Sequence, residues 1–351
     1  MIKINIIPRN YIGFPNLGLE FEVGRTAFKV FGLDIYWYGI IVSVAIILGF
    51  FYAMKRAGQF GLIADKVFDT AIVGLVGGFI CARLYYVIFS TQKYSFTEIF
   101  TKIRDGGFAI YGGIIGAILF ALVFMKLRKM RILPVLDLAG MSFLLGIGLG
   151  RWGNFFNQEA YGAATAGNLP WGMTGNQIAS NVGMNALVHP CFLYESLWCI
   201  LGFIFLHFYS KKLRSFDGEI FLLFAAWYGI GRAFNEQLRS DSLMIGDFKV
   251  SQFLAAMTAG AAIGAFIYYK QRVSKNPESQ LFRDTEESAE LIAAYNEKQL
   301  LDKEKADAKK ALKEEEAPSI LAVDNEPDNV GDDDSVVPPE NEEEDNDGEN
   351  S

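Results

Sequence analysis

Long apolar runs with few charges recur along the first 275 residues of the chain. Seven of them approach the roughly 20 residues that a helix needs to cross a hydrocarbon core of about 30 Å. The runs are Ile35–Met54, Val67–Phe89, Phe108–Leu127, Leu133–Phe156, Phe192–Tyr209, Glu219–Leu238 and Val250–Tyr269. This pattern predicts an all-α polytopic integral membrane protein with about seven transmembrane helices.

The loops between these runs differ in basic content, which predicts their orientation. One alternate set of loops, with the end of the last run, carries thirteen basic residues: Lys55, Arg56, Lys66, Lys126, Arg128, Lys129, Arg131, Lys211, Lys212, Arg214, Lys270, Arg272 and Lys275. The opposite set carries five, and its longest member, residues 156–188, has none. This asymmetry places the N-terminus outside and the C-terminus in the cytoplasm, although four basic residues in the N-terminal arm argue mildly for the reverse.

Charge divides the chain into a body and a tail. Residues 276–351 hold 25 Asp and Glu against 7 Lys and Arg, a net charge of −18, whereas residues 1–275 have a net charge of +10. Apart from a short helical stretch near Ala293–Lys313, the tail lacks the apolar periodicity that folding requires. We therefore expect an extracytoplasmic arm at 1–34, a seven-helix membrane domain at 35–272 with an outer loop at 156–188, and an acidic, largely disordered cytoplasmic tail at 273–351. For the tail, a solvating extension is favoured over a specific docking site.

Polar residues within the apolar runs gather toward the outer side of the predicted membrane. They are Tyr38, Arg83, Tyr111, Arg151, Asn154, Asn157, Glu159, His189, Glu195, Tyr228, Arg232, Glu236 and Arg239. Four of these, from Tyr228 to Arg239, share one helical face because their spacing follows the helical repeat. An arginine inside a membrane is rare unless it meets a partner, water or an anionic ligand.

Two interpretations of this cluster compete. Each arginine could simply pair with a nearby carboxylate, as Arg232 could with Glu236, and hold helices together. Alternatively, the surplus of arginines over free glutamates indicates an anionic ligand, and at this depth a phospholipid phosphate fits. Most glycines nearby suit close helix packing, whereas Gly153 and Gly162 lie among polar residues and are expected to shape the backbone beside a ligand.

The segment Gly150–Gly162, which reads GRWGNFFNQEAYG, resembles the signature of the bacterial prolipoprotein diacylglyceryl transferases. Matching residues recur in the family's order: Trp37-Tyr38-Gly39, Ala82-Arg83, Asp105-Gly106-Gly107, Tyr111-Gly112-Gly113, His189-Pro190 through Glu195, and Tyr228-Gly229 through Arg232 to Glu236 and Arg239. The resemblance covers roughly residues 30–270 and leaves out the acidic tail.

The resemblance implies transfer of the diacylglyceryl group from phosphatidylglycerol to the lipobox cysteine thiol of an exported preprolipoprotein, with release of glycerol phosphate. This thioether-forming step is the first in bacterial lipoprotein maturation. It also implies a multi-pass protein of the bacterial cell membrane with its active site toward the outer leaflet, and neither metal nor other cofactor is expected.

Carried onto this chain, the resemblance gives each polar residue a role. Arg151 and Arg232 would bind the phosphate and stabilise the leaving glycerol phosphate, the kind of electrostatic role that usually contributes most to catalysis. Asn154 and Asn157 would orient the head group, while Glu159 and Glu236 would hold the arginines. Phosphatidylglycerol binding would also involve Tyr38, Arg83, Gly162 and Tyr228. Supporting roles fall to His189, Glu195 and Arg239.

The chain departs from part of the family at Tyr111, where many members have a histidine proposed as the general base. A thiol with a pKa of about 8.5 must lose its proton before it attacks. A phenol with a pKa of about 10 accepts that proton poorly at neutral pH unless nearby cations lower its pKa. Tyr111, His189 and the positive field itself therefore remain alternative ways to produce the thiolate.

Two other functional classes were weighed. A transporter would also collect charged residues between helices, but the outer cluster has no matching inner set in the sequence, and no internal repeat is visible. A different membrane enzyme, lipid-handling or not, would need its own motif. An intramembrane serine protease would need a Gly-x-Ser-x-Gly-like serine with a histidine partner, which the sequence lacks. A metal-dependent phospho-alcohol transferase would need clustered aspartates, whereas Asp65, Asp69, Asp105 and Asp137 are scattered.

Overall fold

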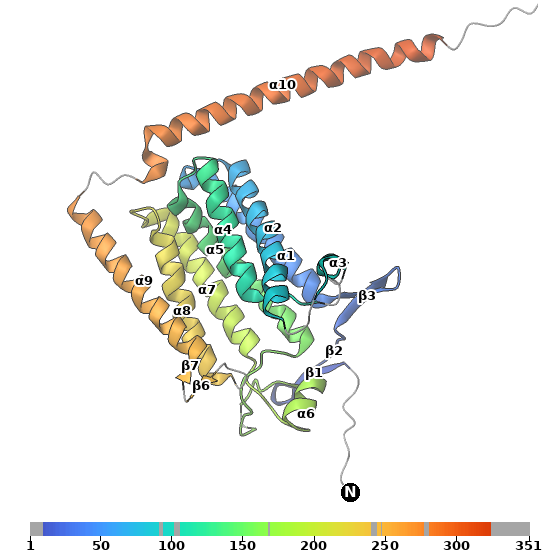
Figure 1. Cartoon of the computed structure of the whole chain (residues 1–351), viewed down its shortest axis with the longest axis vertical. Helices are drawn as coiled ribbons and strands as arrows, with labels where there is room; N and C mark the ends of the chain where they lie inside the picture. Colours follow the sequence, from blue (N-terminus) through green and yellow to red (C-terminus); the bar gives the residue numbers. More distant parts are fainter. Residues whose placement is uncertain are drawn as a thin grey trace, which may run out of the picture. The chain divides into compact units, whose positions relative to one another are not determined.

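The computed structural model describes residues 10–90, 94–101, 106–167, 169–239, 244–246, 248–276 and 281–323. Seven long helices lie where the seven apolar runs predicted them (Figure 1): α1 (Trp37–Arg56), α2 (Ala64–Phe89), α4 (Ile110–Leu127), α5 (Ile132–Asn157), α7 (Cys191–Lys212), α8 (Glu219–Leu238) and α9 (Val250–Lys275). The predicted all-α polytopic membrane fold is confirmed.

Helix α8 differs from the other six long helices in its composition. The other six are long and apolar enough to cross a membrane, whereas α8 is not among the helices that meet this criterion. The reason is the charge and polarity that α8 carries, with Arg232, Asn235 and Glu236 in its last two turns. Because α8 packs against α5, α7 and α9, it belongs to the bundle, and a count of seven spans stays a prediction.

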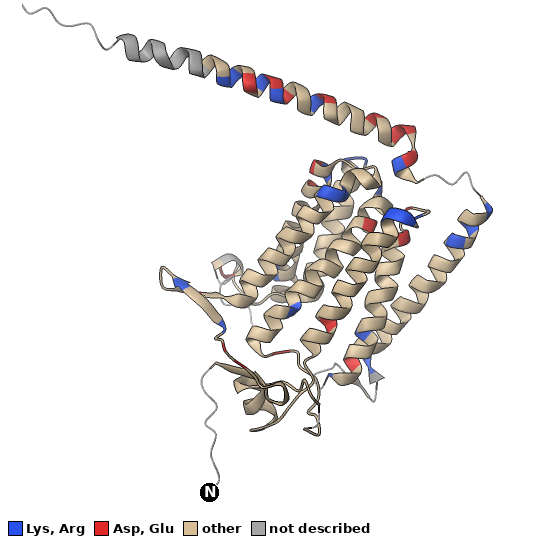
Figure 2. Ribbon diagram, turned by 180° about the vertical axis from the view of Figure 1, so that it is seen from behind, with Lys and Arg blue, Asp and Glu red and all other residues tan. Residues whose placement is uncertain are grey.

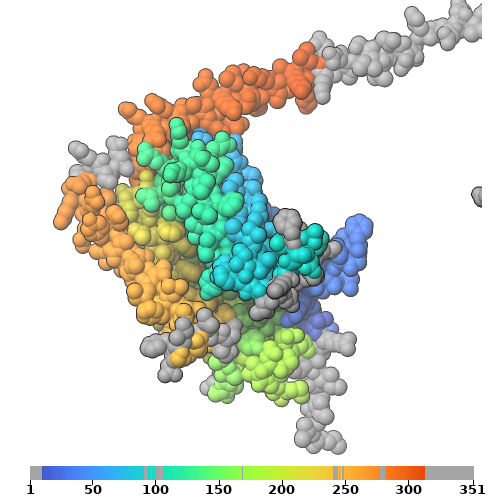
Figure 3. Space-filling model, in the orientation of Figure 1, coloured from blue at the N-terminus to red at the C-terminus, as the bar shows by residue number. Residues whose placement is uncertain are grey.

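Helix α5 lies at the centre of the bundle, in contact with α1, α7 and α8. Leu138, Met141 and Leu144 on α5 are almost completely buried, and the burial of such side chains stabilises the fold by roughly 1.5–3 kcal/mol each. Helices α2 and α4 form a second pair and cover one face of the bundle (Figure 3). They approach closely through small residues, since a Cβ on Gly116 would lie 2.3 Å from the Cβ of Cys81.

A small extramembrane cap closes one end of the bundle. Strands β2 (Leu19–Glu22), β1 (Tyr11–Phe14) and β5 (Thr174–Gly175) form an antiparallel sheet in that order, followed along the chain by helix α6 (Asn176–Val182). Ile12, Met173, Ile178 and Val188 form its buried core. A hairpin of β3 (Thr26–Val30) and β4 (Leu33–Tyr36) leads into α1. The arm and the outer loop, far apart in sequence, therefore fold together.

The opposite end of the bundle, called the inner end below, holds a second polar network. In Figure 2 the charged residues of the bundle helices lie mainly toward the helix ends, whereas α10 carries charges along its length. Arg214 pairs with Asp137 at 3.0 Å, and Lys270 pairs with Glu219 at 2.6 Å. Arg56 donates to Ser210 at 2.9 Å. The expectation that the outer cluster has no inner counterpart is wrong, because charged residues near the helix ends were attributed to loops.

Two helical elements follow α9 in the tail. A short 3-10 helix, η4 (Phe282–Asp284), precedes helix α10 (Glu286–Val323), which is longer than the stretch expected near Ala293–Lys313. The chain divides into two compact units at Tyr295, residues 1–295 and 296–351. Residues 324–351, where the Asp/Glu/Pro runs lie, are outside the described ranges, as is Asp105.

Candidate active site

Glu195 joins the outer ends of three helices. It begins the second turn of α7 and is 4% exposed. Its Oε1 accepts a hydrogen bond from Arg151 Nη2 of α5 at 2.8 Å and lies 3.6 Å from Arg232 Nη1 of α8. A buried carboxylate needs such partners, since an unpaired buried charge is costly. One glutamate thus holds both predicted phosphate-binding arginines.

A second carboxylate completes a charge-balanced set. Arg232 Nη2 lies 2.7 Å from Oε2 of Glu236, one turn further along α8. Arg151, Arg232, Glu195 and Glu236 therefore carry two positive and two negative charges. Each guanidinium has five N–H donors, and each arginine side chain is about a fifth exposed. Donors therefore remain that an anion could engage, although the set as a whole carries no surplus charge.

Asn235 is a further member of the site that the sequence analysis missed. It is 5% exposed and donates from Nδ2 to Glu195 Oε2 at 3.0 Å and to the carbonyl of Cys191 at 3.4 Å. Its Oδ1 is buried without a hydrogen-bond partner among the described residues. The clue in the sequence is an amide on an apolar helix three residues after Arg232, on the face that carries the arginine.

The end of α5 presents the two asparagines to Glu159. Oε1 of Glu159 accepts from Asn154 Nδ2 at 2.9 Å and from Asn157 Nδ2 at 3.2 Å. Glu159 was expected to hold an arginine. The structure instead gives that role to Glu195, and connects the asparagines to Arg151 only through a 3.4 Å contact from Arg151 Nη1 to Asn154 Oδ1.

The chain turns sharply after α5 because Gln158 adopts a left-handed conformation, with φ 52°. Its side chain links the cap to the bundle, donating to the carbonyl of Tyr11 at 3.1 Å and accepting from the Gln177 amide at 2.9 Å. Sequence reasoning did not single out Gln158. Only the tertiary fold shows that its amide connects two distant segments.

Gly162 lies where three segments cross. Its N–H donates to the carbonyl of His189 at 2.8 Å, and it forms a β-bridge with Arg239. A Cβ at this position would lie 2.8 Å from Cys191 Sγ and from the Leu238 carbonyl oxygen. The glycine thus permits close backbone crossing. The backbones of Arg239 and His189 hold the outer loop here, and His189 Nδ1 lies 3.3 Å from the Tyr194 hydroxyl.

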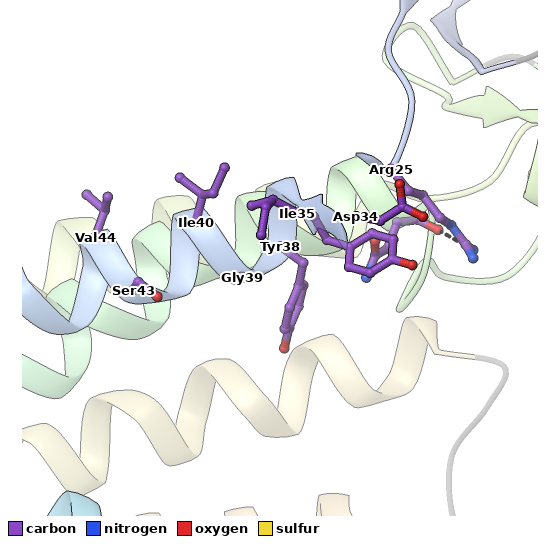
Figure 4. Close-up of a pocket in the computed structure, with 10 residues that line it drawn as sticks. Arg25, Asp34, Ile35, Tyr38, Gly39, Ile40, Ser43 and Val44 are labelled. Carbon is purple, nitrogen blue, oxygen red and sulfur yellow. Dashed lines mark hydrogen bonds between the residues drawn. The ribbon is translucent and has the colours of Figure 1, made fainter. Parts of the chain in front are cut away.

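A groove of about 800 Å³ runs along the start of α1 and reaches Asn157 at the end of α5. Figure 4 shows Arg25 and Asp34 at its outer end and Ile40 and Val44 further along the helix. Arg25 Nη2 donates to the Asn157 carbonyl at 3.1 Å. Tyr38 packs against the α5 backbone, since a Cβ on Gly153 would lie 2.6 Å from its ring. The groove is therefore polar at one end and apolar along its length.

The remaining predicted residues differ in their distance from the cluster. Tyr228 lies on α8, close enough to Glu195, Arg151 and Arg232 for their charges to act on its hydroxyl. Tyr111, near the start of α4, is 67% exposed, and no hydrogen bond to another described residue fixes its hydroxyl. The structure therefore brings Tyr228 to the arginines and provides no contact that brings Tyr111 there.

Arg83 uses its guanidinium to bind backbone carbonyls of the chain between α2 and α4. It is 5% exposed, and its guanidinium donates to the backbone carbonyls of Ile99 at 3.0 Å and of Gly106 at 2.8 Å. Its cationic centre also lies 5.4 Å from the centre of the Tyr94 ring. These contacts join α2 to α3 (Phe96–Thr101) and to Gly106, before the start of α4. Direct contact of Arg83 with a phosphate stays a prediction.

Comparison with known proteins agrees with this arrangement. The sequence model of the family described as prolipoprotein diacylglyceryl transferase matches residues 25–268. This span includes the arginine cluster, which consists of Arg151, Glu195, Arg232, Asn235 and Glu236. The chain belongs to this family. The family resemblance drawn from Gly150–Gly162 is thereby confirmed.

Individual members of the prolipoprotein diacylglyceryl transferase family are similar over the same region. A phosphatidylglycerol–prolipoprotein diacylglyceryl transferase of Clostridioides difficile is 39% identical over 254 residues, which cover 72% of this chain and 98% of that protein. The corresponding protein of Finegoldia magna is 41% identical over 256 residues, 72% of this chain and 99% of its own length. That of Thermotoga maritima is 38% identical over 242 residues, 68% and 82% of the two chains.

Proposed function

We propose that the arginine cluster at the outer end of α5, α7 and α8 is where this chain transfers a diacylglyceryl group from phosphatidylglycerol to a prolipoprotein. Family membership supports the reaction: the chain is a membrane transferase of lipoprotein maturation. The single observation that supports the location is the pair of partly exposed guanidiniums held by one buried carboxylate, Glu195.

In this proposal Arg151 and Arg232 bind the phosphate of the donor lipid. Their positions are fixed beforehand by Glu195 and Glu236, so donors are already aimed at the site when charge develops on the leaving group. Arginine suits this role because its planar group offers paired donors to phosphate oxygens. Asn154, Asn157 and Glu159 would provide donors and acceptors for the glycerol head group, with Gly162 shaping the backbone beside it.

The chemical step replaces a carbon–oxygen bond by a carbon–sulfur bond. The acceptor is the thiolate of the prolipoprotein's lipobox cysteine, which attacks the glycerol carbon that carries the phosphate. The C–S bond forms while the C–O bond breaks, and glycerol phosphate leaves with the electron pair. The nucleophile must be thiolate, so the thiol passes its proton to water before attack, and glycerol phosphate leaves as the dianion. The nearby guanidinium donors favour the anion, whereas Tyr111 has no described contact with them.

The amphipathic groove beside α1 supports a lipid donor. A phospholipid has a charged head and apolar chains, and the groove has Arg25 and Asn157 at one end with Ile40 and Val44 along its length. Tyr38 lies between these two regions. The distribution of basic loop residues supports a position of this site at the outer leaflet of the bacterial cell membrane, the side on which an exported prolipoprotein emerges.

A transporter remains the alternative function, because the structure also has polar groups at the inner end. Two observations weigh against it. Two inner cations are paired with carboxylates, Arg214 with Asp137 and Lys270 with Glu219. Between that pair and Arg151, helix α5 contributes Met141 and Leu144, which are fully buried in the apolar core. A packed apolar layer therefore separates the two polar sets.

The activity is tested with purified protein in detergent, phosphatidylglycerol and a synthetic lipobox peptide. We expect mass spectrometry to find one diacylglyceryl group on the cysteine, with equimolar glycerol phosphate. A peptide with serine in place of cysteine is the first control, and phosphatidylethanolamine as donor is the second. If the cysteine peptide gains no mass, or if the serine peptide gains the same mass, the proposal fails.

A further inference from the structure

The beginning of the C-terminal extension lies against the inner end of the bundle. Residues 281–295 comprise η4 and the first turns of α10, and they belong to the same compact unit as the helices. Leu281 and Phe282 are about 5% exposed and Ser288 is fully buried. Such burial contradicts a purely solvating role for this part of the tail.

Three separate connections of the bundle contact this segment. Ser288 Oγ donates to the carbonyl of Gly61, just before α2, at 3.1 Å. Arg131, just before α5, pairs with Glu287 at 2.5 Å and lies 5.6 Å from the centre of the Phe282 ring. Between α7 and α8, Asp217 Oδ2 accepts a hydrogen bond from the Phe282 amide at 3.0 Å. These connections are far apart in sequence and meet at one short segment.

Asp217 also connects the segment to the central helix α5. Asp217 pairs with Arg214, whose guanidinium also contacts Asp137 of α5 at 3.0 Å. Burial raises the pKa of the Asp217 carboxyl above its ordinary value, while Arg214 and the Phe282 amide act to lower it. The segment therefore supplies one of the interactions that stabilise the ionised form of a partly buried carboxylate.

The contacts at this surface differ in strength. The ion pair of Arg131 and Glu287 is about half exposed on both sides and contributes little, because solvent screens it. Burial of Leu281 and Phe282 contributes more, since stabilisation grows with the apolar area removed from water. The close fit at Gly61 adds specificity: its φ is +76°, and a Cβ there would lie 2.5 Å from Ser288 Oγ and 2.7 Å from the Arg283 Cα.

We propose that the inner end of the bundle is a docking surface for the chain's own residues 281–295, which form a clamp that ties three connections together and stabilises the fold. The match to the family ends at residue 268, so family membership does not assign this element. The clamp ends near Tyr295, whose hydroxyl donates to Asp65 of α2 at 2.5 Å. The second compact unit begins after that residue.

The test compares two substitutions of the same kind in the full-length protein. Phe282→Asp places a charge in the buried contact, whereas Leu300→Asp places one on α10 at a side chain that is 63% exposed. Thermal unfolding is measured in detergent, together with hydrogen exchange of the backbone near residues 61–65, 131 and 217. The conservative variant Phe282→Leu serves to separate loss of the apolar contact from loss of the aromatic ring.

We expect Phe282→Asp to lower the Tm by about 5 °C or more, since a charge replaces a buried apolar ring. Exchange at the three connections should rise together by about tenfold or more, as local opening becomes easier. Phe282→Leu should keep most of the stability, and Leu300→Asp should match the unsubstituted protein. Equal Tm values for Phe282→Asp and Leu300→Asp, or unchanged exchange at all three connections, would overturn the clamp.

Discussion

Arg151 of α5 donates a hydrogen bond to Glu195 of α7 at 2.8 Å, and the same carboxylate oxygen lies 3.6 Å from Arg232 of α8. The two arginines are therefore positioned by one shared acceptor. With Glu236 the set is balanced in charge, so its use in catalysis depends on how donors are aimed more than on a surplus of positive charge. Preorganised donors of this kind stabilise developing charge without reorganisation.

Glu195→Gln tests the shared acceptor. The substitution keeps the shape but removes the charge, so both guanidiniums lose a buried partner, which typically costs 3–5 kcal/mol. We expect kcat for peptide modification to fall by about 10²-fold or more. Steady-state kinetics with phosphatidylglycerol measures this. Glu22→Gln, on an exposed strand residue, should leave kcat unchanged; a comparable kcat in Glu195→Gln would remove Glu195 from the site.

Asn235→Leu tests whether the buried amide acts through Glu195. Leucine has a similar size but cannot donate to Glu195 Oε2, so a buried acceptor is left unpaired. We expect a loss of about tenfold in kcat. In the Glu195→Gln background the same change should cost less than about twofold, because interacting residues give non-additive effects.

The control for Asn235 is its neighbour Phe234, which is 67% exposed. Phe234→Leu should leave kcat unaltered in both backgrounds. If Asn235→Leu costs the same factor with and without Glu195, the amide acts only by packing, and its role in positioning the arginines is refuted.

Tyr111→Phe tests whether the hydroxyl of Tyr111 acts as the general base. Tyr111 is 67% exposed, and no described hydrogen bond or ion pair connects it to Arg151 or Arg232. We therefore expect the variant to keep at least about half of the wild-type kcat, since a general base usually contributes about 10²-fold or more. The measurement is kcat across pH. A drop of two orders of magnitude at neutral pH would instead identify the phenol as the proton acceptor, and rescue by Tyr111→His would support that.

Much of the fold follows from hydropathy alone. The predicted run 219–238 is α8 to the residue, and Val67–Phe89 differs from α2 by three residues at one end. Long apolar runs are predictable because the length of a membrane helix is set by the bilayer. The extramembrane cap was not predictable in this way. Its short strands pair segments about 160 residues apart, such as Ile12 with Gly175.

Most residues of the candidate site were predictable from the sequence, but the contacts between them were not. Polar residues on apolar helices are conspicuous, which is why Arg151, Arg232 and Glu236 were found. Which carboxylate meets which arginine depends on helix rotation and crossing, and these are fixed by packing between helices. Glu159 was therefore assigned to an arginine that Glu195 holds. Arg83 was expected at the site, although it donates to the carbonyls of Ile99 in α3 and of Gly106 before α4.

The inner end shows a related limit. Arg214 and Asp137 were assigned to a basic loop and to a scattered set of aspartates, yet they form a buried ion pair. The tail was read from its charge, and charge alone does not reveal that Phe282 and Ser288 are buried against three connections. Sequence composition describes a segment's average, whereas docking depends on a few residues.

The most direct test of the account is the effect of Arg151→Ala on the modification of a lipobox peptide by purified, membrane-inserted enzyme. Arg128→Ala, at an exposed arginine after α4, is the matched control. We predict that Arg151→Ala loses about 10²-fold or more in the rate of diacylglyceryl transfer while Arg128→Ala keeps the full rate. A near-normal rate in a correctly inserted Arg151→Ala enzyme would contradict the account.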